Sequence, residues 1–190
     1  MGGRMARLEK GNKTQVPQGQ EQAFDEIVEN LGSIPEFGPG SILIHVPELS
    51  KRATALNRYL RYESQVPKKI QEFTMILTAR HMDCQYIWNA HAQSAIEAGV
   101  SEDIVEAVRE ETELPPLADD ERALVNYCRA INNSHYASRG EYQAMLEQFG
   151  EQAFIEITMI IGNYTMLALA INTFESDLPP NRTQPILPVW

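Results

Sequence analysis

Apolar residues recur along the chain at the three- and four-residue intervals of an α-helix. In residues 21–31 they fall at Phe24, Ile27, Val28 and Leu31, and Gly32 follows, which is typical of a helix end. No pair of segments shows the alternation of strands, so we expect an all-α fold. The pattern predicts nine helical segments: residues 21–31, 41–45, 47–62, 68–82, 84–98, a short helix capped by Ser101, and residues 119–132, 138–150 and 152–174.

Prolines and capping residues indicate where several of these helices begin. Pro47 and Pro67 fit the first turns of the helices that follow them, where a missing N–H costs nothing. Ser138 and Glu141 match a capping box, in which the two residues satisfy each other's free backbone N–H groups. Asp83 is expected to be an N-cap or a kink before the helix 84–98.

The chain has the length of one domain, with 190 residues of which 43% are hydrophobic and 22% charged. We expect residues 19–177 to form a single helical domain. Residues 1–18 are polar and are expected to be flexible. Residues 178–190 are rich in proline and are expected to extend along the surface or onto a neighbouring subunit.

The net charge of −10 argues against a nucleic acid or an anionic membrane as a partner, because an acidic surface repels phosphate. The most apolar run, residues 155–171, is interrupted by Glu156 and Asn163 and is shorter than the roughly 20 residues that cross a bilayer. Residues 1–13 lack the apolar stretch of a secretory signal. Cys84 and Cys128 do not form a disulfide framework. These features predict a cytoplasmic protein.

Chemically active side chains gather in residues 67–99. On a helix 84–98, Cys84, Ile87, Trp88 and His91 follow one another at i, i+3, i+4 and i+7 and share one face. Glu72 lies on the preceding helix, and helices joined by a very short connection pack side by side. The Glu72 carboxylate is therefore expected to meet the His91 imidazole.

A glutamate–histidine pair in an apolar groove can transfer protons, because the carboxylate fixes the tautomer of the imidazole. Cys84 would add a thiol and Tyr86 a phenolic donor. The plainer alternative is that Cys84 and His91 are core residues and that Glu72 is a solvated helix residue. The histidines show no metal-ligand spacing, and no glycine-rich phosphate loop occurs. We therefore expect neither a metal nor a cofactor.

The order and spacing of Glu72, Cys84 and His91 resemble the carboxymuconolactone decarboxylase / alkylhydroperoxidase D-like family. In that family a glutamate precedes a C-x-x-C-x-x-x-H motif by about a dozen residues. Ile87 stands where the family has its second cysteine. A subgroup carries a helix similar to A-R-H-x-x-x-x-Y-x-W-x-x-H, which matches residues 79–81, Tyr86, Trp88 and His91.

The resemblance extends to residues 38–60 and 162–174 and implies an all-helical protein that assembles into homo-oligomers, as dimers, trimers or hexamers. It also implies an enzyme in which His91 is the general acid/base and Glu72 orients it, without a metal. The substrate would be a small carboxylated or lactone-like organic molecule. Tyr86 and Trp88 would shape its pocket, and Arg80 would anchor its carboxylate.

Two alternatives remain at the level of sequence. The first is a thiol peroxidase that uses Cys84 as its reactive group. Because Ile87 cannot form the disulfide, such an enzyme would need an external thiol to resolve the oxidised Cys84. The second is a non-catalytic oligomeric scaffold or ligand-binding protein, which the loss of the second cysteine favours.

Overall fold

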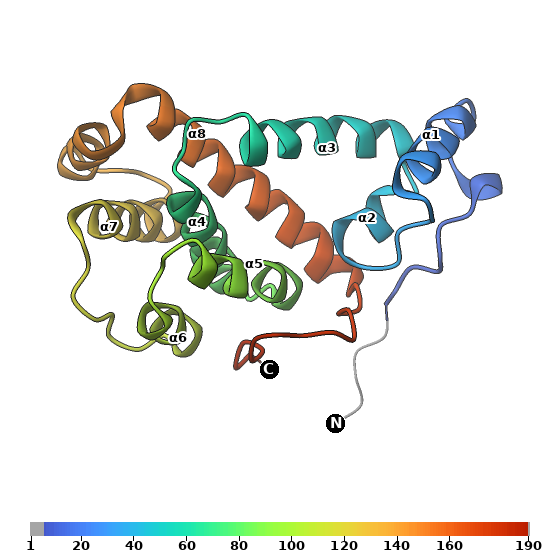
Figure 1. Ribbon diagram of the computed structural model, residues 1–190. Helices are drawn as coiled ribbons and strands as arrows, with labels where there is room; N and C mark the ends of the chain where they lie inside the picture. The colour runs from blue at the N-terminus through green and yellow to red at the C-terminus, as the bar shows by residue number, and fades with distance from the viewer. Residues whose placement is uncertain (1–5, 190) are drawn as a thin grey trace.

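A computed structural model describes residues 6–189, and within this range the chain is all-α and forms one domain, as predicted (Figure 1). No strand occurs among the described residues. Figure 1 shows α8 crossing the molecule, with α6 and α7 at one end and α1 and α2 at the other. Besides a 3-10 turn at Lys13–Gln15, the helices are α1 (Glu21–Leu31), α2 (Gly38–Leu43), α3 (Pro47–Tyr62), α4 (Lys68–His81), α5 (Gln85–Glu97), α6 (Glu102–Glu110), α7 (Asp119–Ser134) and α8 (Arg139–Phe174).

Helix α4 is the centre of the core. It packs against α5, α6, α7 and α8, so it has almost no solvent-facing side. Polar residues on a helix surrounded in this way must find partners inside the protein. Nine of its residues are buried: Ile70, Gln71, Glu72, Phe73, Thr74, Met75, Ile76, Thr78 and Ala79.

The junction between α4 and α5 differs from the prediction by one residue. Helix α5 begins at Gln85, and Cys84 is its N-cap in an extended conformation (φ −91°, ψ 96°). Asp83 does not cap the helix; it has a left-handed backbone (φ 49°) and its carboxylate binds Arg80. Of the two roles expected for Asp83, the cap is wrong and the kink between the helices is confirmed, and Cys84 lies just before the helical face on which we placed it.

Two other helix boundaries also differ. Helix α2 begins at Gly38, three residues earlier than expected, because Pro39 fits its first turn. The last two predicted helices form one element, α8, with a break at Gly150, whose φ of 71° and ψ of 172° are not helical. The capping box of Ser138 and Glu141 at the start of α8 is confirmed.

Both ends of the described chain contact the helical domain. Residues 1–5 of the predicted flexible segment, and Trp190 of the tail, lie outside the described range. The backbone N–H of Arg7 donates to the carbonyl of Phe174 over 2.9 Å. At the other end Leu187 is buried, and its backbone N–H and C=O both bond to the Gln85 side chain. The tail therefore packs against α5 of its own chain.

Helix α8 is the one helix of the described residues that is long and apolar enough to cross a membrane by length and composition alone. Its most apolar window has a mean hydropathy of 1.7, and 56% of that window is buried inside the protein. The buried Glu156 carboxylate on this helix accepts hydrogen bonds from the Tyr59 hydroxyl and the Gln65 backbone N–H, each over 2.8 Å. These bonds fix the end of α3 and the connection to α4 against α8, as in a core helix.

Candidate active site

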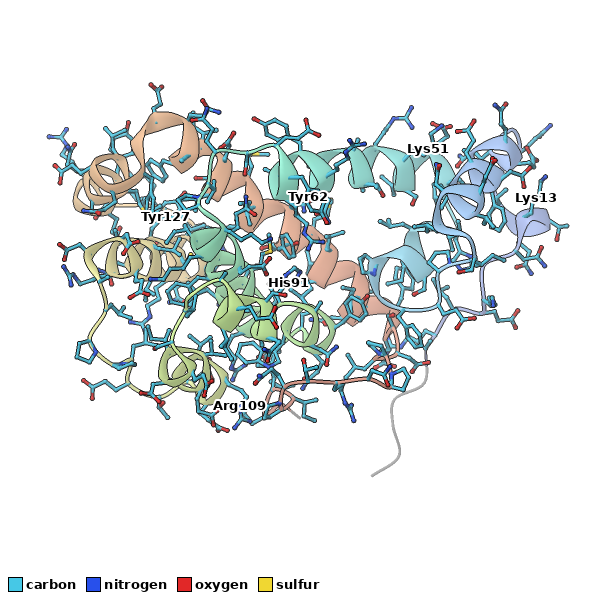
Figure 2. The ribbon with its side chains drawn as sticks, in the orientation of Figure 1. Lys13, Lys51, Tyr62, His91, Arg109 and Tyr127 are labelled. Atoms are coloured by element: carbon cyan, nitrogen blue, oxygen red, sulfur yellow. The ribbon has the colours of Figure 1, made fainter. Side chains whose placement is uncertain are left out.

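Glu72 and His91 meet in the interior, between α4 and α5. The distance from Glu72 Oε2 to His91 Nδ1 is 2.7 Å. Glu72 is 1% exposed and His91 6% exposed. Figure 2 shows His91 in the middle of the molecule, where α4, α5 and α8 come together. The two side chains that the sequence places on neighbouring helices are thus in hydrogen-bond contact.

Lys68 holds the other oxygen of the same carboxylate. Its Nζ lies 2.6 Å from Glu72 Oε1, one helical turn before Glu72 on α4. Burial alone would raise the pKa of Glu72, but the hydrogen bonds and charges of His91 and Lys68 outweigh it and lower the pKa to about 2. Glu72 is therefore an ionised acceptor with both oxygens engaged, and a poor base.

His91 is neutral at pH 7. Burial lowers its pKa below the ordinary value of 6.5, against the opposing hydrogen bond and charge of Glu72, and the nearby charges of Arg61 and Lys68 lower it further. Because Glu72 accepts, Nδ1 carries the hydrogen, which leaves the lone pair of Nε2 available as a base. The ring of Tyr164 packs edge-on against the imidazole, with centroids 5.2 Å apart and planes at 80°, and fixes its orientation.

Cys84 is a buried, protonated thiol. It is fully shielded from solvent, and burial raises its pKa to about 11 despite hydrogen bonds from the backbone N–H groups of Ile87 and Tyr86. Ile87, which replaces the second cysteine of the family motif, is also buried. Cys128 is a second free, buried thiol, and burial raises its pKa to about 12. Neither thiol has the low pKa of a reactive cysteine.

The expected pocket residues Tyr86 and Trp88 are held by other parts of the chain. The Tyr86 ring lies against the backbone of Gly38 in α2. Trp88 is 1% exposed, and its Nε1–H donates to the carbonyl of Pro185 over 2.9 Å. Their described contacts thus anchor α2 and the tail, and a role in binding substrate stays a prediction.

Arg80, expected as a carboxylate anchor, lies at a different place from the Glu72–His91 pair. Its guanidinium binds Asp83 and, over 2.7 Å, the Glu111 carboxylate at the end of α6. It lines a cavity of about 250 Å³ between α4, α6 and α7 that also contains Cys128 and Arg129. Arg80 is therefore engaged by carboxylates of its own chain.

Three residues near His91 were not chosen from the sequence. Lys68 had a usable signal, since it stands four residues before Glu72 on the same helix. Tyr164 and Arg61 come from α8 and α3, far from the motif in sequence, and no local pattern identifies them. Among residues 6–189 no group of three or more His, Cys, Asp or Glu side chains is arranged to hold a metal ion.

The candidate active-site residues lie in the part of the chain that matches a known protein family. The carboxymuconolactone decarboxylase family matches residues 47–130, which include Glu72, Cys84 and His91. No curated protein sequence is significantly similar to the chain.

Several solved structures share the fold at low sequence identity. The alkylhydroperoxidase AhpD core of a peroxidase-related protein from Ralstonia eutropha JMP134 has a TM-score of 0.69 and 17% identity, over 94% of this chain and 95% of that one. The debrominase Bmp8 has a TM-score of 0.64 and 20% identity, over 93% and 92%. An AhpD-like putative antioxidant defence protein from Agrobacterium tumefaciens has a TM-score of 0.63 and 20% identity, over 73% and 96%.

Proposed function

Because the chain belongs to the carboxymuconolactone decarboxylase and AhpD-like family and buries Glu72 against His91, we propose that it is an acid–base enzyme. Its substrate would be a small carboxylated or lactone-like organic molecule. The observation that carries the proposal is the 2.7 Å contact between an ionised glutamate and a neutral histidine, both buried. Such a pair occurs where proton transfer is needed, since the carboxylate stabilises the imidazolium that forms.

Each group has a distinct task in this proposal. His91 Nε2 would accept a proton from the substrate and return it to the product. Glu72 would hold Nδ1–H and stabilise the transient positive charge on the ring. Lys68, 2.6 Å from the other oxygen, would keep Glu72 ionised and stationary. Tyr164 would keep the imidazole plane fixed through its edge-on contact.

The thiol peroxidase alternative is supported by relatives described as AhpD and as peroxidase-related. It requires Cys84 as a thiolate. The raised pKa of Cys84 and its complete burial favour the histidine as the working group.

Two assays on one set of variants test the proposal. Carboxymuconolactone and related lactone acids are assayed for proton exchange and carbon dioxide release, and peroxide consumption is assayed with dithiothreitol present. We expect His91→Gln to lower the lactone activity by roughly 10²–10⁴-fold, and Cys84→Ser to change it less than about threefold. Peroxide consumption that is lost in Cys84→Ser and kept in His91→Gln would support the thiol peroxidase. Inactivity of the intact protein in both assays would favour a ligand-binding scaffold.

We also propose that the protein works in the cytoplasm as a homo-oligomer that pairs through α8. Large apolar residues stand exposed along this helix at steps of four, seven and three residues: Ile155, Met159, Met166 and Leu169 are 56%, 46%, 45% and 55% exposed. Gly162 lies between them with open space around it. The series is nearly symmetric about Gly162, so an antiparallel second copy would set Ile155 against Leu169.

A further inference from the structure

Arg61, whose charge acts on His91, is a cation without an ion-pair partner. Among residues 6–189 it makes no ion pair, and its Nε is buried without a hydrogen-bond partner. Its guanidinium carbon lies 5.3 Å from the centre of the Tyr62 ring. Removing a guanidinium N–H from water without a new acceptor is costly, so a ligand that accepts from it would be stabilising.

Hydrogen bonds to Glu156 hold the residues on either side of Arg61 against α8, the helix that carries Tyr164. Tyr59 and Gln65, on either side of Arg61 in sequence, both bond to Glu156 on α8. Tyr164 lies two helical turns after Glu156 and so shares its face of α8. The positive charge of Arg61 acts on both rings at the site, lowering the pKa of His91 and opposing the rise in that of Tyr164.

Arg61 has no ion-pair partner of its own among residues 6–189. Lys68 and Glu72 neutralise each other over 2.6 Å, and the Glu156 carboxylate, which is held by Tyr59 and Gln65, makes no ion pair with Arg61. This occurs in a chain whose net charge is −10. A local positive site on an acidic protein attracts small anions that the rest of the surface repels.

We propose that Arg61 binds the anionic group of the substrate, which makes small organic carboxylates the substrate class of this site. A guanidinium offers two parallel N–H donors that match a carboxylate, and the unpartnered Nε supplies one of them. The identity of the reaction at His91 rests on the proposed function, whereas the binding of a carboxylate by Arg61 does not. Arg80, which the sequence favoured for this task, is already held by Asp83 and Glu111.

Carboxylate binding at Arg61 would also raise the pKa of His91, the proposed base. Burial lowers the pKa of His91 most, and the Arg61 charge adds to that lowering; a bound carboxylate would offset the Arg61 charge. His91 would then hold a proton more readily when substrate is present than when the site is empty. The substrate would thereby strengthen the base that acts on it.

The test is a binding experiment that needs no turnover. Acetate, benzoate and muconate are titrated into the intact protein, with benzamide as the uncharged counterpart of benzoate, while the imidazole signals of His91 are followed by NMR. We expect at least one carboxylate to bind saturably and to raise the His91 pKa, and benzamide to bind at least tenfold more weakly than benzoate. Arg61→Gln should weaken carboxylate binding at least tenfold, and Arg61→Lys should restore part of it.

Arg58→Gln is the matched control, because Arg58 lies one turn earlier on α3 with a side chain that is 75% exposed. It should bind like the unaltered protein, and circular dichroism confirms that each variant is folded. Absence of saturable carboxylate binding, equal binding of benzamide and benzoate, or unchanged binding in Arg61→Gln would overturn the proposal. The unaltered protein separates the two proposals: if it binds carboxylates through Arg61 but shows no activity on lactone acids, only the acid–base function is refuted.

Discussion

The ring of Tyr86 occupies the space in which Gly38 would carry a side chain. A Cβ built on Gly38 would lie 2.1 Å from the Tyr86 Cζ and 2.6 Å from its hydroxyl oxygen. Gly38 also has φ +63°, a conformation that other residues seldom adopt. The first residue of α2 and the second residue of α5 are thus packed ring against backbone, and this contact fixes α2 beside the helix that carries His91.

Replacing Gly38 by alanine is therefore expected to lower the free energy of unfolding by about 2–4 kcal/mol, from backbone strain and overlap together. Denaturant unfolding followed by circular dichroism measures it. Gly140→Ala is the control, because a Cβ there meets no atom closer than 3.8 Å in the first turn of α8. In a Tyr86→Ala background the cost of Gly38→Ala should fall, since only the strain remains. An unchanged stability of Gly38→Ala would contradict the contact.

Lys68 sets the charge balance of the Glu72–His91 pair. Its ammonium lowers the pKa of both partners, so Lys68→Met should raise both. The groups that act on His91 are Glu72, Lys68 and Arg61, and Tyr164 packs against its ring. We expect the acidic limb of the pH–rate profile, or the NMR titration of His91, to move to higher pH.

Lys69→Met is the control for this shift, because Lys69 binds Glu121 on α7 over 2.7 Å and does not contact Glu72. Lys68→Arg should behave nearly as the unaltered protein does. A His91 titration that stays in place or moves to lower pH in Lys68→Met would show that Lys68 does not act on the pair.

The Glu72–His91 pair makes the free energy of unfolding depend on pH. His91 has a folded pKa below its ordinary 6.5, so the unfolded chain binds this proton first as the pH falls, and unfolding is favoured below about pH 6.5. Glu72 has a folded pKa of about 2 against an ordinary 4.5, so its contribution is present above about pH 4.5 and is lost as the pH falls to 2. Unfolding measured from pH 7 to 3 should show both losses, and Glu72→Gln should lack the second. A flat profile would mean that the pair is not buried as described.

Much of the candidate site could be predicted because helices convert sequence spacing into geometry. Glu72 and His91 are close since α4 and α5 are long, consecutive and separated by only three residues, from Met82 to Cys84. The position of Cys84 was less predictable, because the left-handed conformation of Asp83 delays the start of α5. Arg80 binds the Asp83 carboxylate, which is therefore not available to cap α5.

The sequence alone could not decide between Arg80 and Arg61 as the candidate anchor for a substrate carboxylate. Arg80 lies inside the motif, but the face of α4 on which it stands turns toward α6, where Glu111 binds it. Arg61 lies outside the motif, on α3, and Glu156 holds the end of α3 and the following connection against α8, the helix that carries Tyr164. Both outcomes depend on contacts between helices that are far apart in the chain, and single-sequence periodicity carries no information about them.

The buried state of Cys84 predicts slow alkylation. With its pKa raised from 9.0 to about 11, the thiolate fraction at pH 8 falls by about 100-fold relative to an ordinary cysteine, and burial slows access further. Iodoacetamide at pH 8, followed by peptide mass spectrometry, should leave Cys84 and Cys128 unmodified in the folded protein. Both should react once urea unfolds it, which is the control. Rapid alkylation of Cys84 alone in the folded protein would instead favour the thiol peroxidase.

The exposed apolar stripe on α8 predicts a self-association that a single charge disrupts. In an antiparallel pair related by a twofold axis near Gly162, each copy of the chain contributes the same apolar residues to the interface. Met159→Lys or Met166→Glu would therefore place two like charges in one interface. Either substitution should shift the particle mass, measured by sedimentation equilibrium, toward that of one 21.5 kDa chain. Leu31→Glu tests for a general effect of surface charge, since Leu31 is 60% exposed on α1, away from the stripe. An assembly that tolerates both α8 substitutions and dissociates on Leu31→Glu would place the interface on α1.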